Sequence, residues 1–284
     1  MNRDALKVRV IDAAKSLGIS FNEAFHRLVM ERFLARIARS SHQERFIFKG
    51  GFLLSHYVDL GRETRDLDFL LKNLHAENSS IQRVMSEISA INAGDGFIYT
   101  LTEIEELAHE HMGYGGFRAK FNVLFGTIRE ALDVDIGIGD VVDAQPESFK
   151  LMAGKGKPIF ENEVSLLVYP PETILAEKLQ TLVLRAKQNS RMKDYYDILT
   201  LLRSEKCTVG KTKSAIIATF EHRNTNISLI PVRFSAEDLA HLQKHWSAFF
   251  RAMRNKDAVP ARIEEVVDEI NTALQKIGVG SESY

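Results

Sequence analysis

The sequence contains little that would place the protein in a membrane or in an oxidising compartment. Among its 284 residues there is a single cysteine, Cys207, so the chain can form neither an internal disulfide nor a cysteine-based zinc site. No stretch approaches the roughly 18 consecutive apolar residues of a membrane-spanning helix. The segment after Met1 carries charges where a signal peptide has an apolar core. We therefore expect a cytoplasmic protein without membrane association.

The chain also lacks an excess of charge of either sign. It has 37 basic and 38 acidic residues, a formal net charge of -1 and an isoelectric point of about 6.8. A nucleic-acid partner would therefore have to be bound by a local basic surface, because there is no global basic field. Hydrophobic residues make up 45% and charged residues 26%, which is typical of a globular protein. The length allows one large or two modest domains with a well-buried core.

The spacing of apolar residues predicts an α+β protein, with a mixed β-sheet flanked by helices over 1–165 and a mostly helical region over 166–284. In the first part we expect two helices within 5–40, a helix over 75–92, and strands at 46–48, 67–71, 97–102, 117–125 and 131–138, the last two joined by a turn at Gly126 and Thr127. In the second part we expect helices at 173–187, from 194 to about 202, from the capping pair Ser235 and Asp238 onward, and at about 261–276.

Two pairs of aspartates lie within predicted strands. Asp66 and Asp68 are two residues apart, so their side chains project from the same face of a strand, and Asp133 and Asp135 repeat the spacing. Adjacent carboxylates repel one another unless a cation lies between them, and a hard divalent ion suits such oxygens. A third carboxylate facing the first pair would complete a two-metal site for in-line displacement at phosphorus. The alternative is that these are ordinary solvated residues at strand ends.

A glycine pair precedes the first of these strands. Gly50 and Gly51 follow a predicted strand and open a predicted helix, where backbone amides can approach a phosphate and the helix N-terminus favours an anion. The alternative interpretation is a tight turn. His109 and His111 lie in an acidic loop, and we interpret them as surface residues rather than ligands.

Charged residues recur on the helices predicted in the second part. Lys178 and Arg185 are seven apart and lie on one stripe of a helix, where Lys178 could contact a triphosphate, snorkel, or pair with Glu177. Asp194 and Asp197 share a face at the start of the next helix, where they could simply complement the helix dipole.

Four short segments occur in the order found in a known family. They are Phe48-Lys49-Gly50-Gly51, Arg62-Glu63-Thr64-Arg65-Asp66-Leu67-Asp68, Glu177-Lys178-Leu179 and Lys193-Asp194-Tyr195-Tyr196-Asp197. Over about residues 45–200 the chain resembles the AbiEii-type nucleotidyltransferases, which include the MenT-type enzymes. These are the toxins of bacterial abortive-infection and toxin–antitoxin pairs, and they are similar to the polymerase-beta nucleotidyltransferase superfamily.

The resemblance implies a role for each matching residue. Gly50, Gly51 and Thr64 would hold nucleotide phosphates, and Asp66 and Asp68 would bind metal and act in catalysis. Asp135 fits the third metal ligand better than Asp133. In the helical part, the residues implied in catalysis or nucleotide binding are Lys178, Arg185, Asp194 and Asp197. Lys193 stands where the family has arginine, so the charge is kept but bidentate geometry is lost. Gly51 stands where many superfamily members have serine, which removes one hydroxyl donor.

The resemblance also implies an activity. The protein would transfer a nucleoside monophosphate from an NTP to an acceptor such as a tRNA 3′ end or another RNA, with Mg²⁺ or Mn²⁺, and Asp135 or Asp194 would accept the proton of the attacking hydroxyl. It would act as a toxin with a cognate antitoxin. The alternatives are a nucleotide-binding module without transfer activity, a metal-dependent phosphohydrolase, and a structural interaction protein. The preferred NTP, the acceptor, the antitoxin and the oligomeric state stay open.

Overall fold

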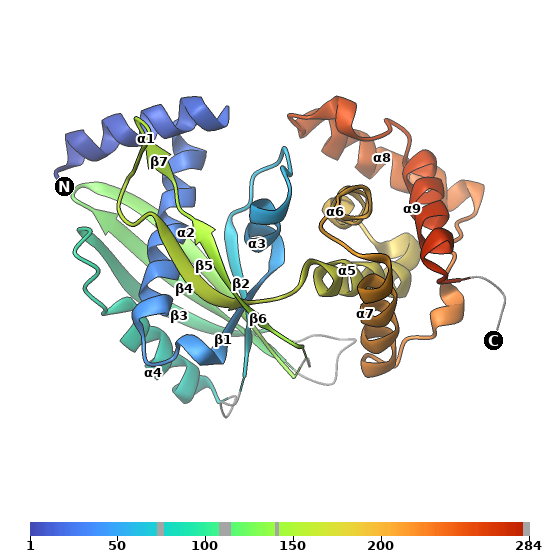
Figure 1. Cartoon of the computed structure of the whole chain (residues 1–284), viewed down its shortest axis with the longest axis horizontal. Helices are drawn as coiled ribbons and strands as arrows, with labels where there is room; N and C mark the ends of the chain where they lie inside the picture. The colour runs from blue at the N-terminus through green and yellow to red at the C-terminus, as the bar shows by residue number, and fades with distance from the viewer. Residues whose placement is uncertain (73–76, 108–114, 140–141, 281–284) are drawn as a thin grey trace. The chain divides into compact units, whose positions relative to one another are not determined.

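The structure is a computed structural model that describes residues 1–72, 77–107, 115–139 and 142–280 (Figure 1). His109 and His111, interpreted above as surface residues, lie outside this described part. Its contacts divide the chain into two compact units. The first unit consists of Met1–Leu53 and Glu63–Tyr169, and the second of Leu54–Arg62 and Pro170–Tyr284. The predicted domain division at 165/166 falls inside a strand of the first unit, and the helix α3 (Gly50–Tyr57) begins in the first unit and ends in the second.

The first unit is built on a seven-stranded mixed sheet in the order β3-β4-β5-β2-β1-β9-β6. The pairs β2–β5 and β1–β9 are parallel, and the other neighbours are antiparallel. This mixed sheet with flanking helices confirms the predicted α+β class. The strands of the sheet are β1 (Phe46–Lys49), β2 (Asp66–Leu71), β3 (Phe97–Leu107), β4 (Gly116–Phe125), β5 (Ile128–Ile138), β6 (Gln145–Lys150) and β9 (Glu163–Val168). A separate small ribbon pairs β7 (Ala153–Gly154) with β8 (Lys157–Pro158).

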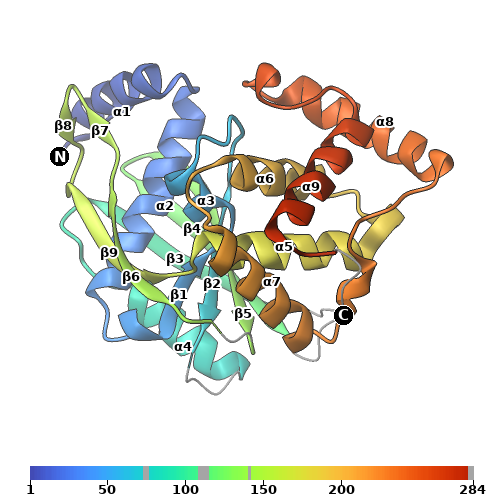
Figure 2. The ribbon, with the colours of Figure 1, turned by 45° about the vertical axis from the view of Figure 1, so that its right-hand side comes forward.

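One face of this sheet is the core of the first unit. The helices α1 (Arg3–Leu17), α2 (Phe21–Arg39) and α4 (Asn78–Ser89) belong to this unit, and α2 and α4 pack on the sheet (Figures 1 and 2). Phe33 of α2 contacts the rings of Tyr99 and Phe121, with centroid distances of 5.4 and 5.0 Å. On β5, Leu132 and Val134 are fully buried on this face, so the aspartates that alternate with them lie on the opposite face.

The second unit is helical within the described residues. Its long helices are α5 (Pro171–Arg185), α6 (Met192–Arg203), α7 (Val209–His222), α8 (Ala236–Ala252) and α9 (Ile263–Ile277). The predicted capping box is confirmed at the start of α8, where the Ser235 hydroxyl accepts a hydrogen bond from the Asp238 amide. The segment 54–62 joins this unit: the Gly61 carbonyl accepts from the Arg254 amide, and Asn255 donates to Asp59. No helix in the described residues is long and apolar enough to cross a membrane.

The structure contains elements that the sequence pattern did not predict. The strands β6 and β9 extend the sheet beyond β1, and α7 lies between the predicted helices of the second unit. β6 has the sequence Gln-Pro-Glu-Ser-Phe-Lys and lies at the sheet edge with one buried side chain, so it carries no alternating apolar signal. α7 contains glycine and β-branched residues, which lower helix propensity, and buries only Thr212, Ile216 and Phe220. The helix predicted over 75–92 is shorter in the structure, where α4 spans Asn78–Ser89; residues 75 and 76 lie outside the described part.

Candidate active site

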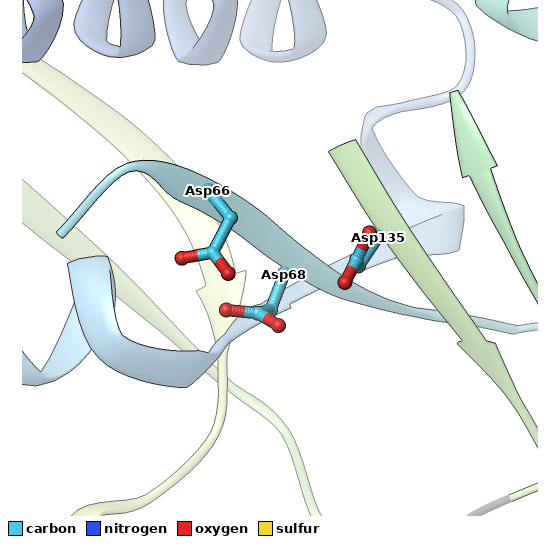
Figure 3. Close-up of side chains that lie close together, drawn as sticks. All are labelled: Asp66, Asp68 and Asp135. Atoms are coloured by element: carbon cyan, nitrogen blue, oxygen red, sulfur yellow. The ribbon is translucent and has the colours of Figure 1, made fainter. Parts of the chain in front are cut away.

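Three of the predicted acids come together on the polar face of the sheet. β2 and β5 are parallel neighbours, and their register sets Asp66 opposite Asp133 and Asp68 opposite Asp135. Asp66, Asp68 and Asp135 each offer one carboxylate oxygen, and these three oxygens lie within 4.8 Å of one another. Figure 3 shows Asp66 and Asp68 on one strand and Asp135 on the next, with their carboxylates gathered on the same side. Strand pairing alone therefore brings together residues almost 70 positions apart in the chain.

The parallel register decides which member of the second pair joins the group. Asp135 lies opposite Asp68 and contributes an oxygen to the group of three. Asp133 lies two residues earlier on the same strand, opposite Asp66 on β2 and Lys120 on β4. The sequence left Asp133 as an alternative third ligand, and the geometry of the described residues favours Asp135. All three acids of the group are half-buried. A site of this exposure can accept a ligand that retains some water.

The glycine turn lies directly against this group. Gly50 has a positive φ of +76°, which a side chain rarely adopts. A Cβ atom built on Gly50 would lie 1.9 Å from the Asp68 Oδ2 atom and 2.4 Å from its Cγ atom. Position 50 therefore requires glycine both for its backbone conformation and for room beside the Asp68 carboxylate. Gly51 follows in the first turn of α3, and Thr64, half-buried, stands two residues before β2.

The start of β2 is held by a residue that the sequence analysis did not single out. His26 of α2 is 9% exposed, and its Nε2 atom lies 2.8 Å from the carbonyl oxygen of Arg65, the residue that precedes Asp66. Its Nδ1 atom lies 3.7 Å from Glu130. A helix that packs on the core face thus anchors the backbone immediately before the first metal-ligand candidate. Sequence alone carries no signal for this contact because the two residues are 39 positions apart.

Arg118 is a second residue that the sequence analysis missed. Its Nε and Nη2 atoms donate to the Oδ1 and Oδ2 atoms of Asp135 at 2.7 and 2.8 Å, a two-point ion pair between neighbouring strands. Hydrogen bonding to Asp135 raises the pKa of the Arg118 guanidinium above its ordinary value, and the charges of Asp135 and Asp133 act in the same direction. The two-residue turn at Gly126 and Thr127 implies this pairing, because it sets Arg118 opposite Asp135.

The three-carboxylate group fits a hard divalent cation. Its donors are all oxygen, they come from two rigid strands, and they already lie within coordinating reach of a common point. Mg²⁺ and Mn²⁺ both prefer such oxygen donors, whereas softer metals prefer sulfur or imidazole. Asp66, Asp68 and Asp135 are therefore the residues that could hold the ion.

The remaining predicted acids form a buried network in the second unit. The Lys178 Nζ atom lies 2.9 Å from both Asp194 Oδ1 and Asp197 Oδ2. The Arg62 Nη2 atom donates to Asp197 Oδ2 at 2.6 Å and to Asp197 Oδ1 at 2.9 Å, and Arg191 Nε lies 3.0 Å from Asp194 Oδ2. Asp194 and Asp197 are 1% and 0% exposed. These two acids therefore act as counter-ions to buried cations and do not merely complement the helix dipole.

Charge in this network favours the ionised forms of Asp197 and Lys178. Burial alone would raise the pKa of Asp197, but the charges of Lys178 and Arg62 outweigh it and hold that pKa below its usual value. Burial alone would lower the pKa of Lys178, yet Asp197 and Asp194 raise it above the usual value. The predicted alternative partner of Lys178, Glu177, instead pairs with Arg223 at 3.1 Å. Arg185 lies exposed at the last position of α5, where its charge suits the helix C-terminus.

Comparison with known proteins identifies the family. Residues 32–275 match the family described as "Nucleotidyl transferase AbiEii toxin, Type IV TA system". The chain belongs to the AbiEii family. This match confirms the resemblance read from the four sequence segments and extends it across both units. A search of curated protein sequences finds no match.

Comparison with solved structures finds similarity to proteins of low sequence identity. The AbiEii chain is similar to JHP933 from Helicobacter pylori, with a TM-score of 0.51, 16% identity, and coverage of 91% of this chain and 92% of that one. An antigenic nucleotidyltransferase-like protein from Paracoccidioides brasiliensis matches at a TM-score of 0.39 and 15% identity, over 70% of this chain and 88% of that one. At these identities JHP933 shows a shared fold only, so the chemistry of this AbiEii member has to be argued from its own residues.

Proposed function

We propose that this AbiEii protein transfers a nucleoside monophosphate from an NTP to the 3′ end of an RNA, such as a tRNA, and that it does so as the toxin of a toxin–antitoxin pair. The observation that carries the proposal is the group of Asp66, Asp68 and Asp135 on adjacent parallel strands beside the Gly50 turn, in a chain of a nucleotidyltransferase family. The antitoxin would be its protein or regulatory partner, and RNA its acceptor.

The proposed reaction exchanges one bond at phosphorus for another. The acceptor hydroxyl oxygen forms a bond to the α-phosphorus, the bond from that phosphorus to the bridging oxygen breaks, and pyrophosphate leaves. The hydroxyl proton passes to Asp135 or Asp194. Mg²⁺ or Mn²⁺ held by the three aspartates would neutralise charge on the triphosphate.

The chain's own groups would act by positioning and by electrostatics. Backbone amides at Gly50 and Gly51, together with Thr64, are proposed to hold phosphate oxygens. By family resemblance, the residues of the second unit that contribute nucleotide contacts or catalysis are Lys178, Arg185, Asp194 and Asp197. The ion pairs of Lys178 support a fixed, fully charged ammonium group. Substituting Lys178 with methionine tests whether that charge is needed for transfer or only for folding.

Incorporation of labelled nucleotide tests the proposal directly. The full chain would be incubated with total RNA, Mg²⁺ or Mn²⁺, and each of the four NTPs labelled at the α-phosphate, and the RNA 3′ ends would be sequenced. We expect label in RNA from the wild type and a loss of at least about 100-fold in Asp68→Asn, since one metal ligand is removed. Asp133→Asn is the matched control, because Asp133 lies on the same strand and face as Asp135 but outside the group.

Two further readouts separate the alternatives. Pyrophosphate released in proportion to labelled RNA supports transfer, whereas free phosphate without labelled RNA would indicate a phosphohydrolase. NTP binding with no product of either kind would indicate a nucleotide-binding module. In cells, Asp68→Ala should relieve a growth arrest caused by the wild type, and arrest that persists at equal expression would contradict a toxin role based on this group.

A further inference from the structure

The three carboxylates of Asp66, Asp68 and Asp135, here called the acid group, have charged neighbours on the polar face of the sheet. Strand register places Arg118 of β4 opposite Asp135 of β5, which is itself opposite Asp68 of β2. Two residues away along the strands, the same register places Lys120 opposite Asp133, and Asp133 opposite Asp66. Directly opposed residues on neighbouring strands share a face, so two rows of charged residues cross this part of the sheet. In each row two aspartates lie side by side, with a cation next to them on β4. In the row that contains Asp135 and Asp68, Arg118 lies opposite Asp135 and Lys49 of β1 lies opposite Asp68. The guanidinium of Arg118 pairs with Asp135, a member of the acid group, at 2.7 and 2.8 Å.

Arg118 forms hydrogen bonds with the Asp135 carboxylate, which is one of the three proposed to bind the cation. Both oxygens of Asp135 accept hydrogen bonds from Arg118, and one of them also belongs to the group of oxygens within 4.8 Å. The side chains of Arg118 and Asp135 are 33% and 21% exposed, so the pair is only partly screened by solvent. Asp135 thus has a rigid orientation before any metal ion arrives.

The pairing has two opposite effects on cation binding. It orients Asp135 and reduces its repulsion with Asp66 and Asp68, which favours binding. It also places a permanent positive charge beside the position of a doubly charged ion, which disfavours binding. The second effect should dominate, because repulsion between a unit charge and a divalent ion a few ångströms apart remains large at the effective dielectric of a partly buried site. Orientation of a carboxylate already fixed on a central strand adds less.

We propose that Arg118 is a positioning residue for Asp135 that also weakens binding of a bare divalent cation, so that the cation binds tightly only together with the negative charge of a nucleotide triphosphate. This inference rests on the proposed function. It assigns to Arg118 the coupling between cation and nucleotide, a role distinct from direct ligation. Lys120 is less suited to the same role because its ammonium group pairs with Glu103 and Glu105, at 3.1 and 3.0 Å.

Titration with Mn²⁺ tests the proposal without depending on catalysis. Free Mn²⁺ would be measured by electron paramagnetic resonance for wild type, Arg118→Gln and Arg118→Lys, with and without an NTP analogue whose α–β bridge cannot be cleaved. We expect Arg118→Gln to bind Mn²⁺ alone about tenfold more tightly than wild type, as removal of one nearby positive charge implies. The increase in Mn²⁺ affinity caused by the analogue should shrink in Arg118→Gln and persist in Arg118→Lys, which keeps the charge.

Arg129→Gln is the matched control. Arg129 lies on β5 on the same face as Asp135, but six residues away, which is about 20 Å along a strand and beyond the screening length of physiological salt. Arg129→Gln removes one positive charge, as Arg118→Gln does, and should leave the affinity for Mn²⁺ unchanged. Thermal unfolding would establish that each variant is folded, and Arg118→Met serves as the neutral variant if Arg118→Gln is not.

The outcomes separate this inference from the proposed function. Equal or weaker binding of Mn²⁺ alone by the neutral variants, or no Mn²⁺ binding by the wild type even with the NTP analogue, would overturn the role of Arg118. If the expected affinity pattern appears while no labelled RNA forms, the role of Arg118 in cation binding stands and RNA transfer fails. If RNA is labelled but the neutral variants bind Mn²⁺ as the wild type does, transfer stands and the coupling by Arg118 fails.

Discussion

At the scale of single residues, the contact between Gly50 and Asp68 constrains the acid group most tightly. The glycine has no side chain, and the space that a Cβ atom would fill is taken by a carboxylate oxygen. The sequence predicted a glycine turn for phosphate binding, but it could not show that the same glycine makes room for a metal-ligand candidate 18 positions later. That information lies in the antiparallel pairing of β1 with β2, which sets Lys49 opposite Asp68.

Substitution of Gly50 by alanine should therefore displace Asp68. We expect Gly50→Ala to lower Mn²⁺ affinity and RNA labelling by at least about tenfold and to destabilise the fold by about 1–2 kcal/mol, because a positive φ and a steric clash combine. Gly156→Ala is the control: Gly156 has a positive φ of +68° but no atom within 4 Å of a built Cβ. Equal loss of Mn²⁺ binding in both variants would show that backbone strain alone, not the contact with Asp68, is responsible.

The thiol of the single cysteine, Cys207, should react slowly with alkylating reagents in the folded protein. Burial, together with the charge of Glu172, raises the pKa of the Cys207 thiol to about 12. Because the thiolate is the reactive form, alkylation by iodoacetamide at pH 7.5 should be at least about 100-fold slower in the folded protein than in guanidinium chloride. The labelled fraction would be followed by mass spectrometry. Similar rates in both conditions would contradict the raised pKa.

At the scale of elements, the strand register that forms the site could be predicted from the sequence only in part. The turn at Gly126 and Thr127 was predicted, and it fixes which residues of β4 face β5. The parallel pairing of β5 with β2 was not predictable, because it joins strands separated by a helix and two other strands. Asp135 could therefore be favoured by family resemblance, but its closeness to Asp68 required the structure.

The helix α2 carries a buried charge cluster that no sequence pattern revealed. Arg32 and Arg36 are each 1% exposed, and both donate to Asp95, which is also 1% exposed. Arg32 and Arg39 additionally pair with Glu161. Apolar periodicity predicts the existence of this helix, but charged residues on its buried side do not fit that periodicity. Their partners come from loops outside α2, so only the folded chain explains them.

Asp95 should make the first unit sensitive to acid. Burial alone would raise the pKa of Asp95, but hydrogen bonds and charge from Arg36 and Arg32 lower it to about 2. The folded pKa is below the unfolded value of about 3.9, so the stabilisation is present above pH 4 and is lost as pH falls toward 2. Asp95→Asn should cost about 3–5 kcal/mol at pH 7, because it leaves buried guanidinium groups without their counter-charge.

Urea unfolding at pH 7, 4, 3 and 2.5 measures both effects. The stability difference between wild type and Asp95→Asn should narrow as the pH falls from 4 toward 2. Asp4→Asn, which removes a carboxylate whose side chain is 85% exposed in the same unit, should leave the profile close to that of the wild type. A constant difference across this pH range would contradict the lowered pKa of Asp95.

At the scale of the whole chain, the family match and the acid group point to one testable property. The match over residues 32–275 covers both compact units, while the candidate metal ligands all lie in the first. The near-neutral net charge of -1 gives no general attraction to phosphate or nucleic acid. Binding of nucleotide should therefore depend on local groups and on the cation that we propose the three aspartates hold.

Thermal unfolding of the full chain should report this dependence. Mn²⁺ together with an uncleavable NTP analogue, at about 100 times the dissociation constant, should stabilise the folded protein by about 2.7 kcal/mol, since the ligands bind only the folded state. For a chain of this size that corresponds to a rise in Tm of several degrees. If the two units unfold in separate transitions, the one shifted by Mn²⁺ alone should be that of the first unit, which holds the ligands. Asp68→Asn should remove the Mn²⁺-dependent part of the shift and Asp133→Asn should retain it; an undiminished shift in Asp68→Asn would place the cation elsewhere.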